Sequence, residues 1–121
     1  MRGIFDAMEA LKEQSNKQAA AKLMAAGYSI PETDALNMLG DAHNTNHAEN
    51  REFFLNQNNP TNFERTWNTA YYLYKRIGAV SDKVDFDQVM DFTLIQKLGR
   101  EPKYANQKNE YNVQFVPASA T

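Results

Sequence analysis

Apolar residues recur along much of the chain at intervals of three and four, which is the spacing of one face of an α-helix. The clearest instance lies in the middle of the chain, where the apolar positions are Phe63, Trp67, Ala70, Tyr74 and Ile77. Ahead of it, Thr61 and Glu64 have the spacing of a capping box, which fixes a helix start. In the last turn Lys75 and Arg76 suit the exposed carbonyl groups, and Gly78 suits the left-handed closing conformation. The pattern predicts a helix between Thr61 and Gly78 with its apolar face in a core.

Five further segments have helical patterns, although each is shorter or less regular. In order along the chain they cover 4–11, 15–27, 29–40, 47–55 and 81–99. Ser15 is placed to cap the second of these helices, and Gly27 to end it. Ser29 and Glu32 repeat the capping-box spacing before the third helix, which Gly40 would end. The polar residues between the third and fourth segments predict a loop, because their side chains compete for backbone hydrogen bonds.

The chain changes character near its C-terminal end. The last helical segment reads as two short turns that Asp85 or Asp91 would cap, with Val89, Phe92, Ile95 and Leu98 as their buried face. Beyond it the residues are polar and then alternate with aromatic and aliphatic ones, which is typical of a short strand over 111–116. The sequence therefore predicts a mainly all-α fold: a small bundle of five to six short helices over 1–99, followed by an extended tail or linker over 100–121.

Length and composition place the chain in the globular class. Its 121 residues support one domain, and 42% hydrophobic with 23% charged residues argues against disorder. A formal net charge of -2 gives no positive field for a phosphate backbone, so we expect no nucleic-acid binding. The absence of cysteine excludes disulfides, thiolate zinc sites and a thiol nucleophile. The opening stretch has no long apolar run, so it predicts neither a secretory signal nor a membrane span.

Two histidines are the first candidates for chemistry. His43 and His47 are four residues apart, which on a helix would place both rings on one face as metal ligands, with Asp41 or Glu49 as a third ligand. The asparagine-rich interval between them favours a turn instead, and the HExxH pattern of zinc proteases is absent. We therefore interpret both histidines as solvated or capping residues and predict no metal site.

Acidic residues are the second candidates, because four of them gather before and within the last helical turns: Asp82, Asp85, Asp87 and Asp91. Their spacing is not that of an EF-hand loop, and no glycine lies among them to make its sharp turn. Helix caps and a solvated face explain them better. Since nucleophile motifs and glycine-rich phosphate loops are also absent, we predict no enzyme and no cofactor.

The aromatic stripe of the central helix offers a third alternative. Trp67, Tyr71 and Tyr74 would provide flat rings on which a planar ligand or a base could stack. At helical spacing such a stripe is more often part of a core. We therefore expect these rings to be core residues whose polar atoms find partners at its edge.

Three segments together resemble a known family. They are HAENREFFL at 47–55, WNTAYYLYKRIGAV at 67–80 and VDFDQVMDFTLIQKLG at 84–99. They are similar to the C-terminal region of bacterial substrate-binding proteins of ABC importers, of the nitrate, sulfonate and thiamine-precursor type. Ala48, Glu49, Asn50, Phe53 and Phe54 match the family's first element, and the residues from Phe92 to Leu98 match its last. The opening stretch also resembles the family's alanine-loaded helix pair.

The resemblance implies a non-enzymatic helical segment of a periplasmic solute-binding protein that serves ABC-type uptake of a small molecule. The family's two α/β lobes, which form the ligand cleft, are absent from this chain, so its partner would be the remainder of such a protein or another protein chain. An isolated segment would form homo-oligomers. His47, Glu49 and Asn50 are the ligand-binding candidates, because they are the polar residues we place nearest a cleft. The tail would suit a linker to a peptidoglycan-binding domain of the OmpA type.

A second hypothesis needs no parent protein. A stand-alone helical interaction module would present the face of Trp67 and Tyr71, or the terminal strand, to a protein partner. The two hypotheses differ in whether the partner belongs to the same polypeptide.

Overall fold

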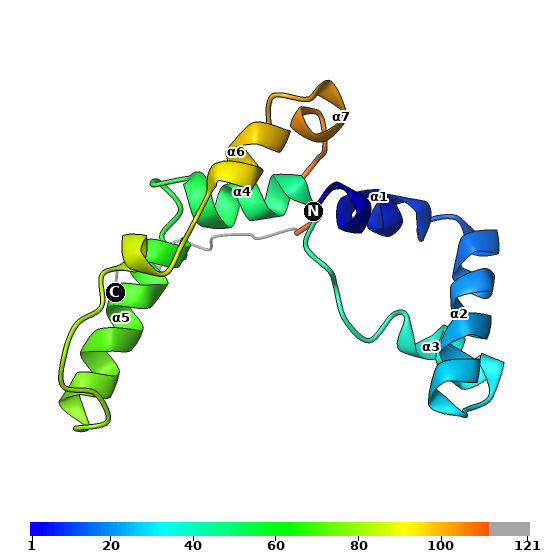
Figure 1. The fold of residues 1–121 in the computed structure, drawn as a ribbon, viewed down its shortest axis with the longest axis horizontal. Helices are drawn as coiled ribbons and strands as arrows, with labels where there is room; N and C mark the ends of the chain where they lie inside the picture. The colour runs from blue at the N-terminus through cyan, green and yellow to red at the C-terminus, as the bar shows by residue number, and fades with distance from the viewer. Residues whose placement is uncertain (112–121) are drawn as a thin grey trace, which may run out of the picture. The chain divides into compact units, whose positions relative to one another are not determined.

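The computed structural model describes residues 1–111, and this part of the chain is built from helices (Figure 1). The elements are α1 (Arg2–Ala10), α2 (Gln14–Tyr28), α3 (Glu32–Met38), α4 (His47–Leu55), α5 (Phe63–Arg76), the 3₁₀ turn η1 (Phe86–Gln88), α6 (Thr93–Leu98) and α7 (Pro102–Ala105). Within the described range no strand forms, which confirms the all-α class. The strand predicted over 111–116 lies outside the described residues. Among the described helices, none has the length and apolarity that crossing a bilayer requires.

The chain divides into two compact units rather than one bundle. The first is Met1–Asn46 and the second is His47–Thr121, of which residues up to 111 are described. The division falls at the end of the polar loop that precedes α4. That loop contributes no large apolar side chain.

The core of the first unit lies between α2 and α3 and is made of small side chains. Ala21, Ala25 and Ala35 are buried there, with Met24, Ile30 and Leu36 packed against them at the edge. Because alanine has only a methyl group, the two helix backbones can approach closely. Each of the three buried alanines removes little apolar surface from water, so this core contributes little hydrophobic stabilisation.

The loop between α2 and α3 differs from the prediction. Gly27 lies inside α2, which continues to Tyr28 and ends at Ser29 in the left-handed conformation with φ of 56°. The backbone N–H groups of Ser29 and Ile30 both donate to the carbonyl of Ala25. Ser29 therefore ends the preceding helix instead of capping the next one, and the expected capping box with Glu32 does not form.

The N-terminal helix α1 buries the side chain of Phe5, whereas the neighbouring Ile4 is exposed. Phe5 is therefore the residue through which α1 joins a core. After this helix the Asn16 side chain donates to the carbonyl of Ala10 at 2.9 Å and so satisfies its C-terminal end. Residue 13, not the predicted Ser15, occupies the N-cap position of α2.

The second unit packs α4 against α5, α6 and α7. Phe54 of α4 lies at the centre of a group of aromatic rings, with its centroid 5.6 Å from Phe63 of α5 and 5.9 Å from Phe92 before α6. The buried apolar residues of α6 and α7 are Ile95, Leu98 and Tyr104. Tyr104 and α7 lie inside the range 100–121 that the sequence assigned to an extended tail. The chain therefore remains folded beyond Gly99, because a tyrosine ring there is buried against α4.

Asparagine side chains build the corner between α4 and α5. Asn59 donates to the carbonyl of Glu52 at 3.3 Å, which satisfies the end of α4. Asn62, 1% exposed, accepts from the N–H of Arg65 at 2.9 Å and donates to the carbonyl of Asn56 at 3.1 Å. Asn62 is therefore the N-cap of α5, and the cap predicted at Thr61 is wrong by one residue.

The other end of α5 confirms the prediction. Gly78 has φ of 76°, and its N–H donates to the carbonyl of Lys75 at 3.0 Å. The next N–H, that of Ala79, donates to the carbonyl of Tyr74 at 2.9 Å. These two bonds form a Schellman closure, which glycine adopts without steric cost.

Candidate functional site

The three predicted ligand-binding residues lie in the first turns of α4. His47 is 0% exposed, Glu49 is also buried, and Asn50 is partly buried. His47 Nε2 lies 2.8 Å from the carbonyl oxygen of Ile95, to which it donates because a carbonyl only accepts. The backbone N–H of His47 donates to Gln107 Oε1 at 3.0 Å. His47 thus holds α4 to the chain on both sides of α7.

The walls around the imidazole are close. A methyl group added at Gly99 would lie 3.3 Å from His47 Cε1, so the absence of a side chain there makes room for the ring. The Tyr104 ring lies on another side, with its centroid 5.9 Å from that of His47. His47 is therefore enclosed by α6 and α7, and it presents no surface to a solute.

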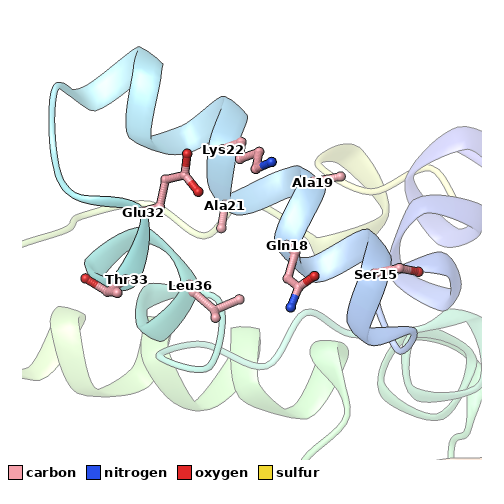
Figure 2. Close-up of a pocket in the computed structure, with 8 residues that line it drawn as sticks. All are labelled: Ser15, Gln18, Ala19, Ala21, Lys22, Glu32, Thr33 and Leu36. Carbon is pink, nitrogen blue, oxygen red and sulfur yellow. The ribbon is translucent and has the colours of Figure 1, made fainter.

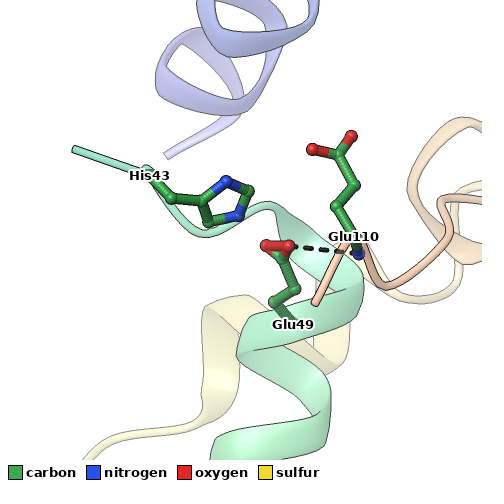
Figure 3. A group of neighbouring side chains, drawn as sticks. All are labelled: His43, Glu49 and Glu110. Carbon is green, nitrogen blue, oxygen red and sulfur yellow. Dashed lines mark hydrogen bonds between the residues drawn. The ribbon is translucent and has the colours of Figure 1, made fainter. Parts of the chain in front are cut away.

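Glu49 makes a similar connection. Its Oε1 accepts a hydrogen bond from the backbone N–H of Glu110 at 3.2 Å, as the dashed line in Figure 3 shows. Together with the bond to Gln107, this contact ties the segment after α7 to the start of α4. Two of the three residues that the sequence singled out for a ligand, His47 and Glu49, are thus engaged in holding the second unit together.

The helical pairing of the two histidines does not form. His43 is exposed and precedes α4, which begins at His47. The spacing of four residues brings two rings to one face only when both lie on the same helix. His43 belongs to the first unit and His47 to the second.

The acidic residues serve partly as expected. Asp91 Oδ1 accepts from the N–H of Thr93, the first residue of α6, at 2.8 Å, although Phe92 and not Asp91 occupies the N-cap position. Hydrogen bonds from the side chain and the backbone of Thr93 hold the pKa of Asp91 below its ordinary value of 3.8, because they stabilise the carboxylate. Asp85 precedes η1 without a side-chain cap bond and lies 3.5 Å from Lys83 Nζ.

A first pocket of about 420 Å³ lies between α2 and α3. Figure 2 shows its lining: Ser15, Gln18, Ala19, Ala21, Lys22, Glu32, Thr33 and Leu36. The charged groups of this lining are one ammonium and one carboxylate, from Lys22 and Glu32, among small side chains. No single ligand chemistry is favoured by that mixture. Sequence reasoning missed the pocket because its residues come from two separate helices.

A second pocket, of about 320 Å³, lies against α5. We call it the α5 pocket; its lining is Trp67, Ala70, Tyr71, Tyr74, Val80, Asp82 and Val84. The segment after α5 turns back along the helix, and the Trp67 indole N–H donates to the carbonyl of Val84 at 2.6 Å. The lining is largely apolar, with one carboxylate.

This arrangement corrects the expectation that the aromatic stripe is core. None of the 14 residues described for α5 is buried, and Ile77 is 74% exposed. Phe63 packs on Phe54 at the start of the helix, whereas Tyr74 and Ile77 at its other end are more than half exposed. The stripe is thus a core contact at one end and an open surface at the other.

Comparisons with known protein families, with curated proteins and with solved structures find no match for this chain.

Proposed function

We propose that this chain is a helical segment of a periplasmic solute-binding protein for ABC-type uptake, and that α5 packs against the remainder of that protein. The observation that carries the proposal is the exposed apolar surface on the second half of α5. Tyr72, Leu73, Tyr74 and Ile77 are all more than half exposed there. Burying each such side chain would contribute about 1.5–3 kcal/mol, so a covering surface would stabilise the helix considerably.

The proposed role of the segment is structural. His47 Nε2 and Glu49 Oε1 bond to the backbone of the second unit, which suits a scaffold better than a solute site. The solute would then be held by lobes that this chain does not contain. The resemblance of the segments around α4, α5 and α6 to the C-terminal region of such proteins is the second support.

A stand-alone interaction module is the second candidate. It uses the same exposed surface of α5 and is favoured by the α5 pocket, because a pocket beside an open aromatic surface suits a separate partner. The two candidates are distinguished by the gene's full reading frame. Coding sequence for α/β lobes joined to this chain is required by the first and excluded by the second.

The exposed surface itself is tested on the purified chain. We expect self-association in sedimentation and strong binding of an apolar dye, because the surface of α5 lacks its cover. Replacing Leu73 and Ile77 together by aspartate should give a monomer with weak dye binding. The matched control replaces Arg65 and Thr69, which are exposed on the same helix, by aspartate and should leave association unchanged.

Two results would count against the proposal. One is a monomeric parent chain with no more dye binding than the Leu73 and Ile77 variant. The other is tight one-to-one binding of nitrate, a sulfonate or a pyrimidine by this chain alone in calorimetry, because the solute site would then lie within it.

A further inference from the structure

We propose that the α5 pocket binds a small organic cation, whose apolar body contacts the rings of Trp67, Tyr71 and Tyr74 and whose charge faces Asp82. The site lies wholly within the second unit. It goes beyond the proposed function, and it does not depend on that function being correct.

The polar groups of the lining favour a cation over an anion. The indole N–H of Trp67 is already given to the Val84 carbonyl at 2.6 Å, which leaves the Tyr71 and Tyr74 hydroxyls as the side-chain donors of the lining. The charged group that remains is the carboxylate of Asp82, which is exposed and repels anions. A neutral polar ligand would find two tyrosine hydroxyls, but no partner on the alanine and valine side chains of the wall. The lining therefore favours a positive charge.

The rings favour a cation for an independent reason. The face of an aromatic ring carries negative potential and attracts an ammonium or guanidinium group within about 6 Å of its centre. The Tyr71 ring shows this attraction within the chain, because Lys75 Nζ lies 5.5 Å from its centroid, and a bound cation would have to displace that ammonium from the ring. Three aromatic residues and one carboxylate around a single pocket combine ring attraction with charge pairing.

The size of the pocket limits the ligand. A volume of about 320 Å³ is near the lower end of small-molecule pockets, which span roughly 300–1,000 Å³. A quaternary ammonium group with a short chain fits that limit and matches the apolar walls with its methyl groups. Because the pocket is open to solvent on one side, we expect a dissociation constant on the order of 1 mM.

The experiment uses the purified chain and choline as the probe. Trp67 is the single tryptophan, so its indole N–H gives one NMR signal that reports on the pocket. Titration with choline chloride should shift this signal saturably. Two controls run in parallel: sodium chloride at the same concentrations, and 3,3-dimethylbutan-1-ol, a neutral molecule of the same shape as choline. We expect the neutral molecule to bind at least fivefold more weakly.

Variants test the two halves of the site separately. Asp82→Asn should weaken choline binding about fivefold, and Tyr74→Leu should weaken it by a similar factor. Asp87→Asn is the matched control, because Asp87 is an exposed carboxylate in η1 that does not line the pocket. All three positions are exposed, so the variants should keep the helical circular dichroism of the parent chain.

Three outcomes would overturn the proposal. They are equal affinity for choline and its neutral counterpart, unchanged affinity in Asp82→Asn, and no saturable shift beyond that caused by sodium chloride. None of them bears on the association test of Leu73 and Ile77, so failure of the cation site and failure of the proposed function are distinguishable.

Discussion

The two units of this molecule hold their short helices together with different kinds of side chain. The first packs α2 on α3 through alanine methyl groups. The second joins α4 to its neighbours through aromatic rings and through buried polar side chains, among them His47 and Asn62. Small side chains bring helix axes close but specify their relative position weakly. Buried hydrogen bonds specify position, because an unmet polar group in the interior is costly.

The difference predicts how each unit responds to substitution. A core of methyl groups has little to lose by truncation and is sensitive to added volume. A core of rings and bonded polar atoms is sensitive to truncation, because each side chain removed leaves a cavity or an orphaned partner. The following predictions test this contrast in decreasing order of expected effect.

Truncation of the largest buried side chain should have the greatest effect. Tyr104→Ala is expected to lower the free energy of unfolding of the second unit by about 3–5 kcal/mol, since the ring is 1% exposed and leaves a cavity beside His47. Urea denaturation followed by Trp67 fluorescence measures this change. The exposed Tyr72→Ala serves as control and should shift the free energy by no more than about 0.5 kcal/mol. Equal effects of the two changes would contradict the structure.

Added volume should act on the first unit. Ala35, 0% exposed, lies between α2 and α3, so Ala35→Leu is expected to destabilise that unit by about 1–3 kcal/mol through overpacking. Amide hydrogen exchange resolves the effect, which should appear in residues 14–38 and leave α4 protected. Ala26→Leu, at an exposed position of α2, is the matched control and should leave exchange unchanged. A stabilised Ala35→Leu variant would show that the two helices are not in close contact.

The cap of α5 provides the third test. Asn62→Ala should cost about 1–2 kcal/mol in the free energy of unfolding of the second unit, because both the N–H of Arg65 and the carbonyl of Asn56 lose their partner. Thr61→Ala, one residue earlier and exposed, should cost less than about 0.5 kcal/mol. Thermal denaturation compares the two. If Thr61→Ala cost more than Asn62→Ala, Thr61 would be the N-cap of α5, as the sequence predicted.

Two glycines are expected to respond with opposite signs. Gly27 lies within α2, and a methyl group added there would meet no atom within 4 Å, so Gly27→Ala should raise the free energy of unfolding by about 0.5–1 kcal/mol through helix propensity. Gly78→Ala should lower it by about 1 kcal/mol, because φ of 76° strains any side chain. Urea denaturation of both variants measures the pair. Stabilisation by both changes would mean that α5 does not end in the left-handed turn.

The smallest effect concerns pH. Because the folded pKa of Asp91 is depressed by its bonds to Thr93, its contribution to stability is complete above the ordinary pKa of 3.8 and is lost as the pH falls through the folded value. An NMR titration of the Asp91 carboxyl carbon should therefore give a midpoint below 3.8. Asp91→Asn should remove this acid-dependent loss for α6. A midpoint at or above 3.8 would exclude the bonds between Asp91 and Thr93.

Much of the helical organisation was predictable from residues that act locally. The bounds of α4 and the closure at Gly78 follow from patterns within a few positions, and both were confirmed. The caps at Ser29 and Asn62 were not foreseen, because several neighbouring residues could cap equally well and tertiary contacts select among them. The burial of His47 was also missed, since it depends on Ile95, 48 positions away. The close contact between the His47 ring and Gly99 could not be predicted either, because the two residues are far apart in the sequence.

The corner between α4 and α5 also depends on an amide, that of Asn62, which can change chemically with time. Asparagine side chains hydrolyse slowly to aspartate, and such thermolabile residues are depleted in proteins that endure heat. Conversion of Asn62 would keep the oxygen that accepts from Arg65 but replace the donor facing the Asn56 carbonyl with a negatively charged oxygen. Chemical ageing of this one amide would therefore loosen the turn while leaving its helix cap in place, and aged samples would carry one extra negative charge.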